Sequence, residues 1–119
     1  MKNYIVQTNP FVVPTTDGKL IEEHFGFASI NSGDFSFAHM IAPPFWSEPF
    51  QVCEFDEVTY VISGKKSFQF EDEEIILTKG ESIIVKKGTK IKYSNPFNEA
   101  CEYVSVCIPA FKLDRVERE

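Results

Sequence analysis

Polar side chains of types that can do chemistry recur at even spacing in the middle of the chain. Gln51, Cys53 and Glu57 are separated by two and then four residues. Residues two apart in a β-strand point to the same face, so these three side chains would line one surface. The carboxylate could act as an acid or a base or hydrogen-bond a neighbour, and the amide could hold a sugar hydroxyl or give a weak oxygen contact to a metal. The thiol is either a metal-binding thiolate or a small core side chain.

His39 and Tyr93 are two further candidates for an interior site. His39 shares one face of its stretch with Phe35, Phe37 and Ile41, so we expect it to point inward. An inward histidine would either move a proton or be a hydrogen-bonded core residue. The Tyr93 hydroxyl could donate to a bound anion or enolate, or could be satisfied by a neighbouring group.

Trp46 and Glu48 lie in a stretch, residues 42–49, that contains three prolines. Because proline cannot donate to a strand ladder, we expect an extended loop that crosses the mouth of the site. There an aromatic wall and a carboxylate could grip a ligand, or the indole could simply pack the loop onto the rest of the domain.

The elements that must position these residues are short strands. Glycine and proline interrupt apolar stretches every eight to twelve residues, and no stretch has the 3.6-residue period of a long amphipathic helix. We expect eight strands, which is a jelly-roll count: Phe25–Ile30, Phe35–Ile41, Glu57–Ile62, Ser67–Phe70, Glu74–Leu77, Ser82–Val85, Lys90–Tyr93 and Glu102–Ile108.

Length and composition predict one all-β domain. The chain has 119 residues, 43% of them hydrophobic, and contains no low-complexity linker. We expect an N-terminal arm over residues 1–24 with one or two edge strands, a barrel over residues 25–111, and an exposed tail or short helical turn over residues 112–119.

Charge and cysteine content exclude several classes of partner. The net charge of −6 disfavours binding to a nucleic-acid backbone. No apolar run reaches the roughly 18 residues of a membrane helix and no signal peptide opens the chain, so we expect a cytoplasmic protein without a membrane partner. The three cysteines match no disulfide framework or zinc-finger spacing and are expected to be reduced.

Two segments resemble the motifs of the cupin family. In residues 51–64, Glu57 and Gly64 occupy the glutamate and glycine positions of the first cupin motif. In residues 80–95, Gly80, Gly88 and Asn95 are in register with the second motif. The resemblance covers roughly residues 35–110 and implies a cupin-type jelly-roll β-barrel, also called a double-stranded β-helix.

The resemblance also implies a degenerate metal site. In metal-binding cupins, three histidines and a glutamate converge on a transition metal inside the barrel. Here the histidine positions hold Gln51, Cys53 and Ile91, and only Glu57 is kept. We therefore expect no cofactor and no metal. If a divalent transition metal is bound, its ligands would come from His39, Gln51, Cys53 and Glu57.

Two functions are compatible with these residues. The first is binding of a small polar metabolite, a sugar or a carboxylate, inside the barrel. The alternative is an enzyme of the isomerase or lyase type, in which Glu57 or His39 moves a proton while Gln51 and Tyr93 orient the substrate.

The resemblance and the pattern of apolar positions also predict a homodimer. Small cupins commonly pair through sheet edges and a swapped N-terminal arm. The apolar positions Val58, Tyr60 and Ile62 should face outward from their strand and would suit a buried outer face.

Overall fold

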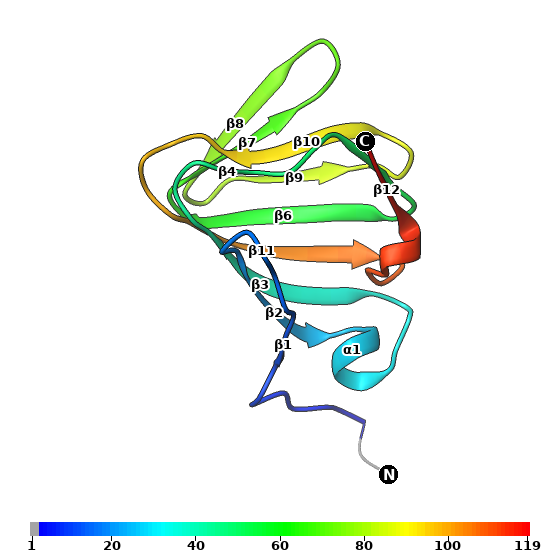
Figure 1. Cartoon of the computed structure of the whole chain (residues 1–119). Helices are drawn as coiled ribbons and strands as arrows, with labels where there is room; N and C mark the ends of the chain where they lie inside the picture. The colour runs from blue at the N-terminus through cyan, green and yellow to red at the C-terminus, as the bar shows by residue number, and fades with distance from the viewer. Residues whose placement is uncertain (1–2) are drawn as a thin grey trace.

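Two antiparallel β-sheets face each other in the computed structural model, which describes residues 3–119 (Figure 1). The first sheet has, in spatial order, β1 (Phe11–Val12), β2 (Leu20–Phe25), β3 (Ser36–Ala42), β11 (Cys101–Ile108), β6 (Asp56–Ser63) and β9 (Ser82–Val85). The second has β12 (Val116–Arg118), β5 (Gln51–Cys53), β10 (Lys90–Asn95), β7 (Lys65–Gln69) and β8 (Glu74–Thr78), with β4 (Trp46–Ser47) paired to β10. This is the expected all-β, double-stranded β-helix fold in a single domain.

The register of the first sheet decides which side chains face the interior. In its central strands, Ser105 lies opposite Ala38 on one side and Thr59 on the other. Directly paired residues share a face, and all three are at most 7% exposed. Val104, one residue along β11, lies opposite His39 and Tyr60, which therefore belong to the outer face.

The core lies between the two sheets. Its main cluster consists of buried residues from both sheets: Ala42, Trp46, Val61, Phe68, Leu77, Val85, Ile91, Tyr93, Cys101 and Tyr103. A smaller cluster at the other end of the barrel joins Cys53, Phe55 and Cys107. The three cysteines are buried and free, as expected.

The prediction of a strand at Phe25–Ile30 is wrong. The structure has β2 up to Phe25 and then the short helix α1 (Phe27–Ile30). Gly26 ends the strand with a φ of 151°, and a Cβ there would come within 2.8 Å of the Glu23 carboxylate. Glu23 in turn accepts a hydrogen bond from the Ser29 N–H, which holds the first helical turn. The other seven expected strands are present, with ends within two residues of the expected ones.

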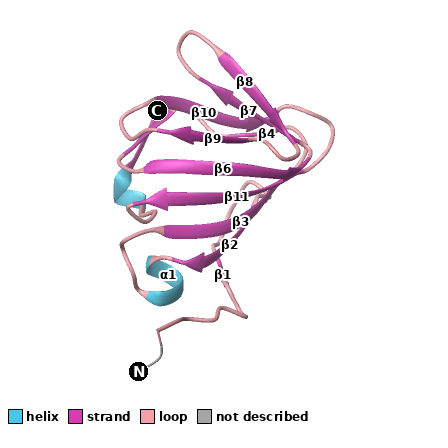
Figure 2. Cartoon of the chain, turned by 180° about the vertical axis from the view of Figure 1, so that it is seen from behind, coloured by secondary structure: helices cyan, strands magenta, loops and turns pink. Residues whose placement is uncertain are grey.

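Both ends of the chain belong to the sheets more fully than expected. The expected N-terminal arm, whose residues 1–2 lie outside the described part, does contain the edge strand β1, but β2 pairs along β3 and extends the first sheet from Leu20. At the other end, a 3₁₀ turn, Leu113–Arg115, is followed by β12, which pairs with β5. For residues 112–119 the expectation is an exposed tail or a short helical turn: the turn is present, but β12 then returns the segment to the second sheet. In Figure 2 the segment that leads to β1 lies at the foot of the view, and the C-terminus lies in the upper half.

Within residues 3–119, no helix has the length and apolar character needed to cross a membrane.

Candidate functional site

Glu57 lies inside the barrel and connects the two sheets. It projects from β6, and its Oε1 accepts a hydrogen bond of 2.9 Å from the Tyr93 hydroxyl on β10. Its Oε2 accepts a hydrogen bond from the Ser105 hydroxyl on β11. Tyr93 is 5% exposed, and burial first and the Glu57 charge second raise its pKa well above the ordinary value, so its hydroxyl stays a donor. The expected inward orientation of Glu57 and Tyr93 is confirmed.

Gln51 and Cys53 point inward from β5 beside this pair. The Gln51 Nε2 donates to Glu48 Oε1 at 3.1 Å, and the Cys53 thiol lies 3.9 Å from Gln51 Oε1. Burial first and the Glu57 carboxylate second raise the pKa of Cys53 to about 12. The thiol therefore stays protonated and is a poor metal ligand or nucleophile.

Glu48 and two cations form the mouth of the barrel. Glu48 Oε2 lies 3.3 Å from an Arg118 guanidinium nitrogen and 3.9 Å from Lys19 Nζ. Lys19 Nζ lies 4.5 Å from the centre of the Trp46 ring. Arg118 and Lys19 come from segments near the two ends of the chain, and the motifs contain no signal for either.

Trp46 is 4% exposed and does not form an open aromatic wall. Its Nε1 donates to Asp17 Oδ2 at 2.7 Å, which ties the proline-rich loop to the segment before β2. Asn95, the asparagine of the second motif, donates from Nδ2 to the carbonyl oxygens of Pro43 and Glu99 at 3.1 and 2.7 Å. The loop is therefore held in place from inside the barrel.

Lys66 is an interior group that the sequence analysis missed. It is 2% exposed on β7, with its Nζ 3.6, 4.8 and 5.2 Å from the ring centres of Tyr103, Tyr93 and Phe68. Burial first and the nearby charge of Lys19 second lower the pKa of Lys66 to about 7. Lys66 takes part in none of the ion pairs of residues 3–119.

Tyr103 supplies a second interior group of unusual character. It is fully buried on β11, and its hydroxyl has no hydrogen-bond partner among residues 3–119. Burial raises the pKa of Tyr103 well above its ordinary value, so the hydroxyl remains a donor. Buried polar groups without a partner are uncommon and mark positions where a polar molecule would be stabilised.

His39 faces outward, so the expectation that it points into the barrel is wrong. Its two ring nitrogens lie 2.8 Å from Glu22 Oε1 and 2.6 Å from Glu102 Oε2 on the neighbouring strands. Ser36, Ala38, Met40 and Ala42 occupy the inner face of β3, while Phe37 and Ile41 share the outer face with His39. The more apolar face of β3 is the outer one, so its hydrophobic pattern predicts the wrong orientation for His39.

The residues at the metal positions do not fit a transition metal. Among residues 3–119, no group of three histidine, cysteine, aspartate or glutamate side chains could hold an ion. Gln51 and Cys53 offer an amide and a protonated thiol, and both Glu57 oxygens accept hydrogen bonds. His39 lies on the opposite face of its sheet and cannot complete the set.

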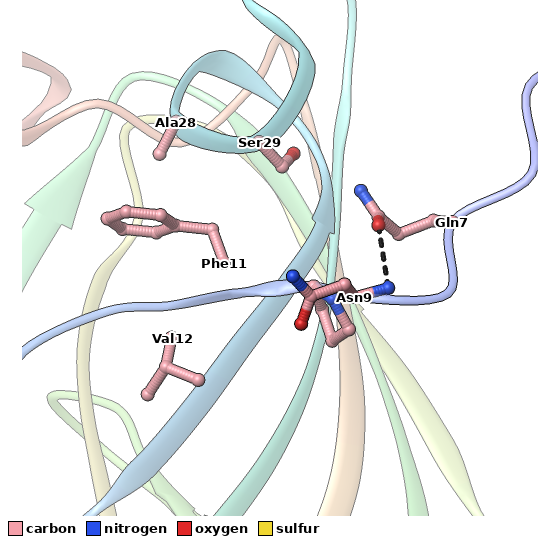
Figure 3. A pocket seen from close by; sticks show the side chains of 7 residues that line it. Gln7, Asn9, Phe11, Val12, Ala28 and Ser29 are labelled. Carbon is pink, nitrogen blue, oxygen red and sulfur yellow. Dashed lines mark hydrogen bonds between the residues drawn. The ribbon is translucent and has the colours of Figure 1, made fainter.

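An open cleft of about 370 Å³ lies outside the barrel, between the N-terminal segment and α1 (Figure 3). Its lining residues are Gln7, Asn9, Pro10, Phe11, Val12, Ala28 and Ser29. The Asn9 N–H donates to Gln7 Oε1 at 3.0 Å within it. None of these side chains is acidic, basic or a strong nucleophile, so the cleft offers hydrogen bonds and apolar contact but no catalytic group.

Comparisons with known proteins come from sequence and from structure. The model of the family described as the cupin domain matches residues 39–107. A curated relative, endoribonuclease YbeY from Myxococcus xanthus (strain DK1622), is 41% identical over 108 residues, which are 91% of this chain and 37% of that protein. The chain thus spans little more than a third of the length of this relative.

Three solved structures are similar in fold. The polyketide cyclase RemF from Streptomyces resistomycificus has a TM-score of 0.75 and 15% identity, with 99% of this chain and 85% of that one covered. A variant of the Streptomyces protein PAC13, solved with uridine, has a TM-score of 0.74 and 15% identity, with 100% and 92% covered. An RmlC-like cupin from Shewanella frigidimarina NCIMB 400 has a TM-score of 0.73 and 12% identity, with 96% of both chains covered. At these identities the likeness shows the fold alone.

Proposed function

Because this chain belongs to the cupin domain family, we propose that it binds a small polar metabolite, a sugar or a carboxylate, inside the barrel. One observation carries the proposal: Gln51, Glu57, Tyr93 and Lys66 come from four strands and converge inside the barrel. Burial of polar and charged groups opposes folding, so a core selected for stability alone would be apolar here. The polar interior is better explained by a ligand that these groups recognise.

The same side chains suit both ligand classes. Glu57 accepts hydrogen bonds and would accept from sugar hydroxyls, while Gln51 would both donate and accept. Tyr93 and Lys66 are donors and would hold a carboxylate oxygen. Glu48 stands at the mouth and would meet the outer end of the ligand, while Trp46 acts indirectly by holding Lys19.

The structural neighbours support a small-molecule role for the barrel. One of them is described as a polyketide cyclase and another was solved with uridine. The ribonuclease activity named for the M. xanthus relative is not transferred, because the chain corresponds to 37% of that protein. The net charge of −6 also disfavours a phosphate backbone as partner.

An isomerase or lyase is the second candidate function, and the position of Glu57 favours it. A carboxylate that faces the interior and is oriented by two hydroxyls is placed to take a proton from a bound substrate. The Tyr93 hydroxyl would then donate to the substrate oxygen and stabilise the negative charge that forms on it. His39 has no part in this reaction, because it lies on the outer face.

Thermal unfolding with a panel of sugars and small carboxylates tests the binding proposal. We expect one class to raise the midpoint by about 5 °C at ten times its Kd. Glu57→Gln should reduce this shift, while Asp72→Asn, in the exposed β7–β8 turn, should leave it unchanged. Absence of any shift across the panel, or an unchanged shift in Glu57→Gln, would contradict the proposal. Turnover of the bound compound that is lost in Glu57→Gln would select the enzyme.

A further inference from the structure

We propose that Lys66 is a nucleophile that forms an imine with the carbonyl group of a small aldehyde or 2-oxo acid inside the barrel. This inference rests on the proposed function and narrows its ligand. A 2-oxo acid is a carboxylate, and the open-chain form of an aldose is an aldehyde, so both ligand classes can present a carbonyl group.

The surroundings of Lys66 are those of a reactive amine. A lysine becomes nucleophilic when burial or a neighbouring cation removes its proton. Lys66 is 2% exposed and is packed among the rings of Tyr103, Tyr93 and Phe68. A lysine retained only to make a surface ion pair would keep its ammonium group in water.

Several charged and titratable groups on neighbouring elements affect the protonation of Lys66. Lys19, before β2, opposes protonation. The carboxylates of Glu48 and Glu57 and the thiol of Cys101 favour protonation, but they do so less than burial opposes it. Burial raises the pKa values of Tyr93 and Tyr103, which stay neutral.

The balance of these influences leaves Lys66 partly neutral near pH 7. Its pKa is lowered from 10.5 to about 7. At pH 7, about half of such an amine is neutral, against about one in 3,000 for a lysine with the ordinary value.

Tyr103 provides an independent observation at the same place. Its hydroxyl is fully buried, protonated and without a hydrogen-bond partner among residues 3–119. Lys66 Nζ lies 3.6 Å from the centre of the Tyr103 ring, so the hydroxyl on that ring would be near a carbonyl group bound at the amine. A hydrogen bond from this hydroxyl would polarise the carbonyl and would satisfy the hydroxyl itself.

The step is balanced in atoms and electrons. The Lys66 nitrogen lone pair forms a bond to the carbonyl carbon, and the C=O π electrons move to the oxygen. The nitrogen loses a proton and the oxygen gains one, which gives a carbinolamine. The C–O bond then breaks, the nitrogen lone pair forms C=N, and oxygen leaves as water with the second proton from nitrogen. No oxidant or reductant is needed.

Exposure increases from Lys66 towards the mouth. Lys66 is 2% exposed and Lys19 9%, whereas the side chains of Glu48 and Arg118 are 14% and 44% exposed. Arg118 belongs to β12, a strand of three residues at a sheet edge, and such short edge elements open at low cost. A small carbonyl compound would therefore enter from the side of the barrel that Arg118 and Glu48 border.

Reductive trapping on the full chain tests the inference. The protein is incubated at pH 7 with glyoxylate or pyruvate and sodium cyanoborohydride, and the product is analysed by intact mass and peptide mapping. We expect one adduct, on Lys66, formed at least about tenfold faster than on Lys65, because Lys65 is exposed and burial does not activate its amine. Lys66→Arg and Lys66→Met should lose this adduct, and the matched Lys65→Arg variant should keep it.

Two outcomes would overturn the inference: no adduct on Lys66, or labelling of Lys66 no faster than that of exposed lysines. Mapping of the wild-type protein decides this even where a variant does not fold. The thermal-shift panel separates the two proposals. A metabolite that stabilises the protein without an adduct would reject the imine and leave binding intact, whereas no stabilisation and no adduct would reject both.

Discussion

Lys66 places a titratable amine among aromatic rings, so its effect on folding depends on pH. The folded-state pKa is about 7, while the unfolded value is 10.5. Between these values the unfolded chain holds a proton that the folded chain has released, so stability from this group rises with pH from about 7 to about 10.5. Below about pH 7 Lys66 is protonated in both states, so the full cost of burying its charge remains.

We therefore expect Lys66→Met to raise the free energy of unfolding at pH 7, by on the order of 3 kcal/mol, because methionine fills similar space without a charge. The gain over wild type should shrink as the pH approaches about 9.5. Urea unfolding of both proteins at several pH values measures this. Lys65→Met, at the exposed neighbour, should show no such pH-dependent gain. A gain for Lys66→Met that is absent or independent of pH would contradict the assigned environment.

The interior residues differ in how well the sequence predicts that their side chains point inward. Gln51, Glu57 and Tyr93 could be placed inside because even spacing and the motif agree on one face. Lys66 could not, since a lysine that follows Gly64 and Lys65 is typical of a solvated turn. Its even spacing from Phe68 was the one available signal, because residues two apart share a face. Spacing alone cannot show that a charge has been buried.

Three neighbouring strands are joined by His39 on the outer face of the first sheet. Its ring nitrogens contact Glu22 on β2 and Glu102 on β11. Partial burial opposes its charged form, but the hydrogen bonds and charges of Glu102 and Glu22 raise the pKa above 6.5. A raised folded-state pKa gives stability that is fully present below the unfolded pKa and is lost as the pH rises through the folded pKa.

His39→Gln should lower the free energy of unfolding by roughly 1 kcal/mol below about pH 6 and by less at alkaline pH. Denaturant unfolding across this range measures the effect. His24→Gln is the matched control: its ring packs edge-on against Phe37 and has no ion pair among residues 3–119, so its effect should not follow this pH dependence. A loss for His39→Gln that is equal at acidic and alkaline pH would show that the charge on His39 is not involved.

Whole elements also differ in whether the local sequence or distant contacts determine them. Strands of four to eight residues that alternate buried and exposed side chains were predictable, because a period of two is a local signal. The β12 strand is three residues long, Val116–Arg118, and exists only because it pairs with β5. The α1 helix depends on Glu23 and Gly26, which precede it, rather than on its own four residues. Such elements are set by tertiary contacts that composition does not reveal.

At the scale of the whole molecule, the first sheet has an outer face that is unusually apolar. Val58 lies opposite Val106 and Ile84, and Tyr60 lies opposite Val104. Tyr60 and Ile84 are 49% and 50% exposed. An antiparallel sheet normally presents polar residues on a solvated face, so this apolar row is a candidate surface for contact with another protein.

A second copy of the chain is the occupant we propose for this face. The five side chains of this row are apolar or aromatic, and the neighbouring His39, Glu22 and Glu102 on the same face pair with one another. A two-fold axis would place the row of one copy against the same row of the other. The expected homodimer has twice the chain mass of 13.6 kDa. Sedimentation equilibrium at micromolar concentration should give this mass for the wild-type protein.

Tyr60→Glu should convert the dimer to monomers, because each copy would bury an unpaired carboxylate at the interface. The monomer itself should fold, since the side chain at this position is half exposed. Ile76→Glu makes a similar change at a residue that is 45% exposed on the second sheet, and it should leave the dimer intact. A wild-type mass of one chain would reject the dimer. A dimer that resists Tyr60→Glu but dissociates with Ile76→Glu would place the interface on the second sheet instead.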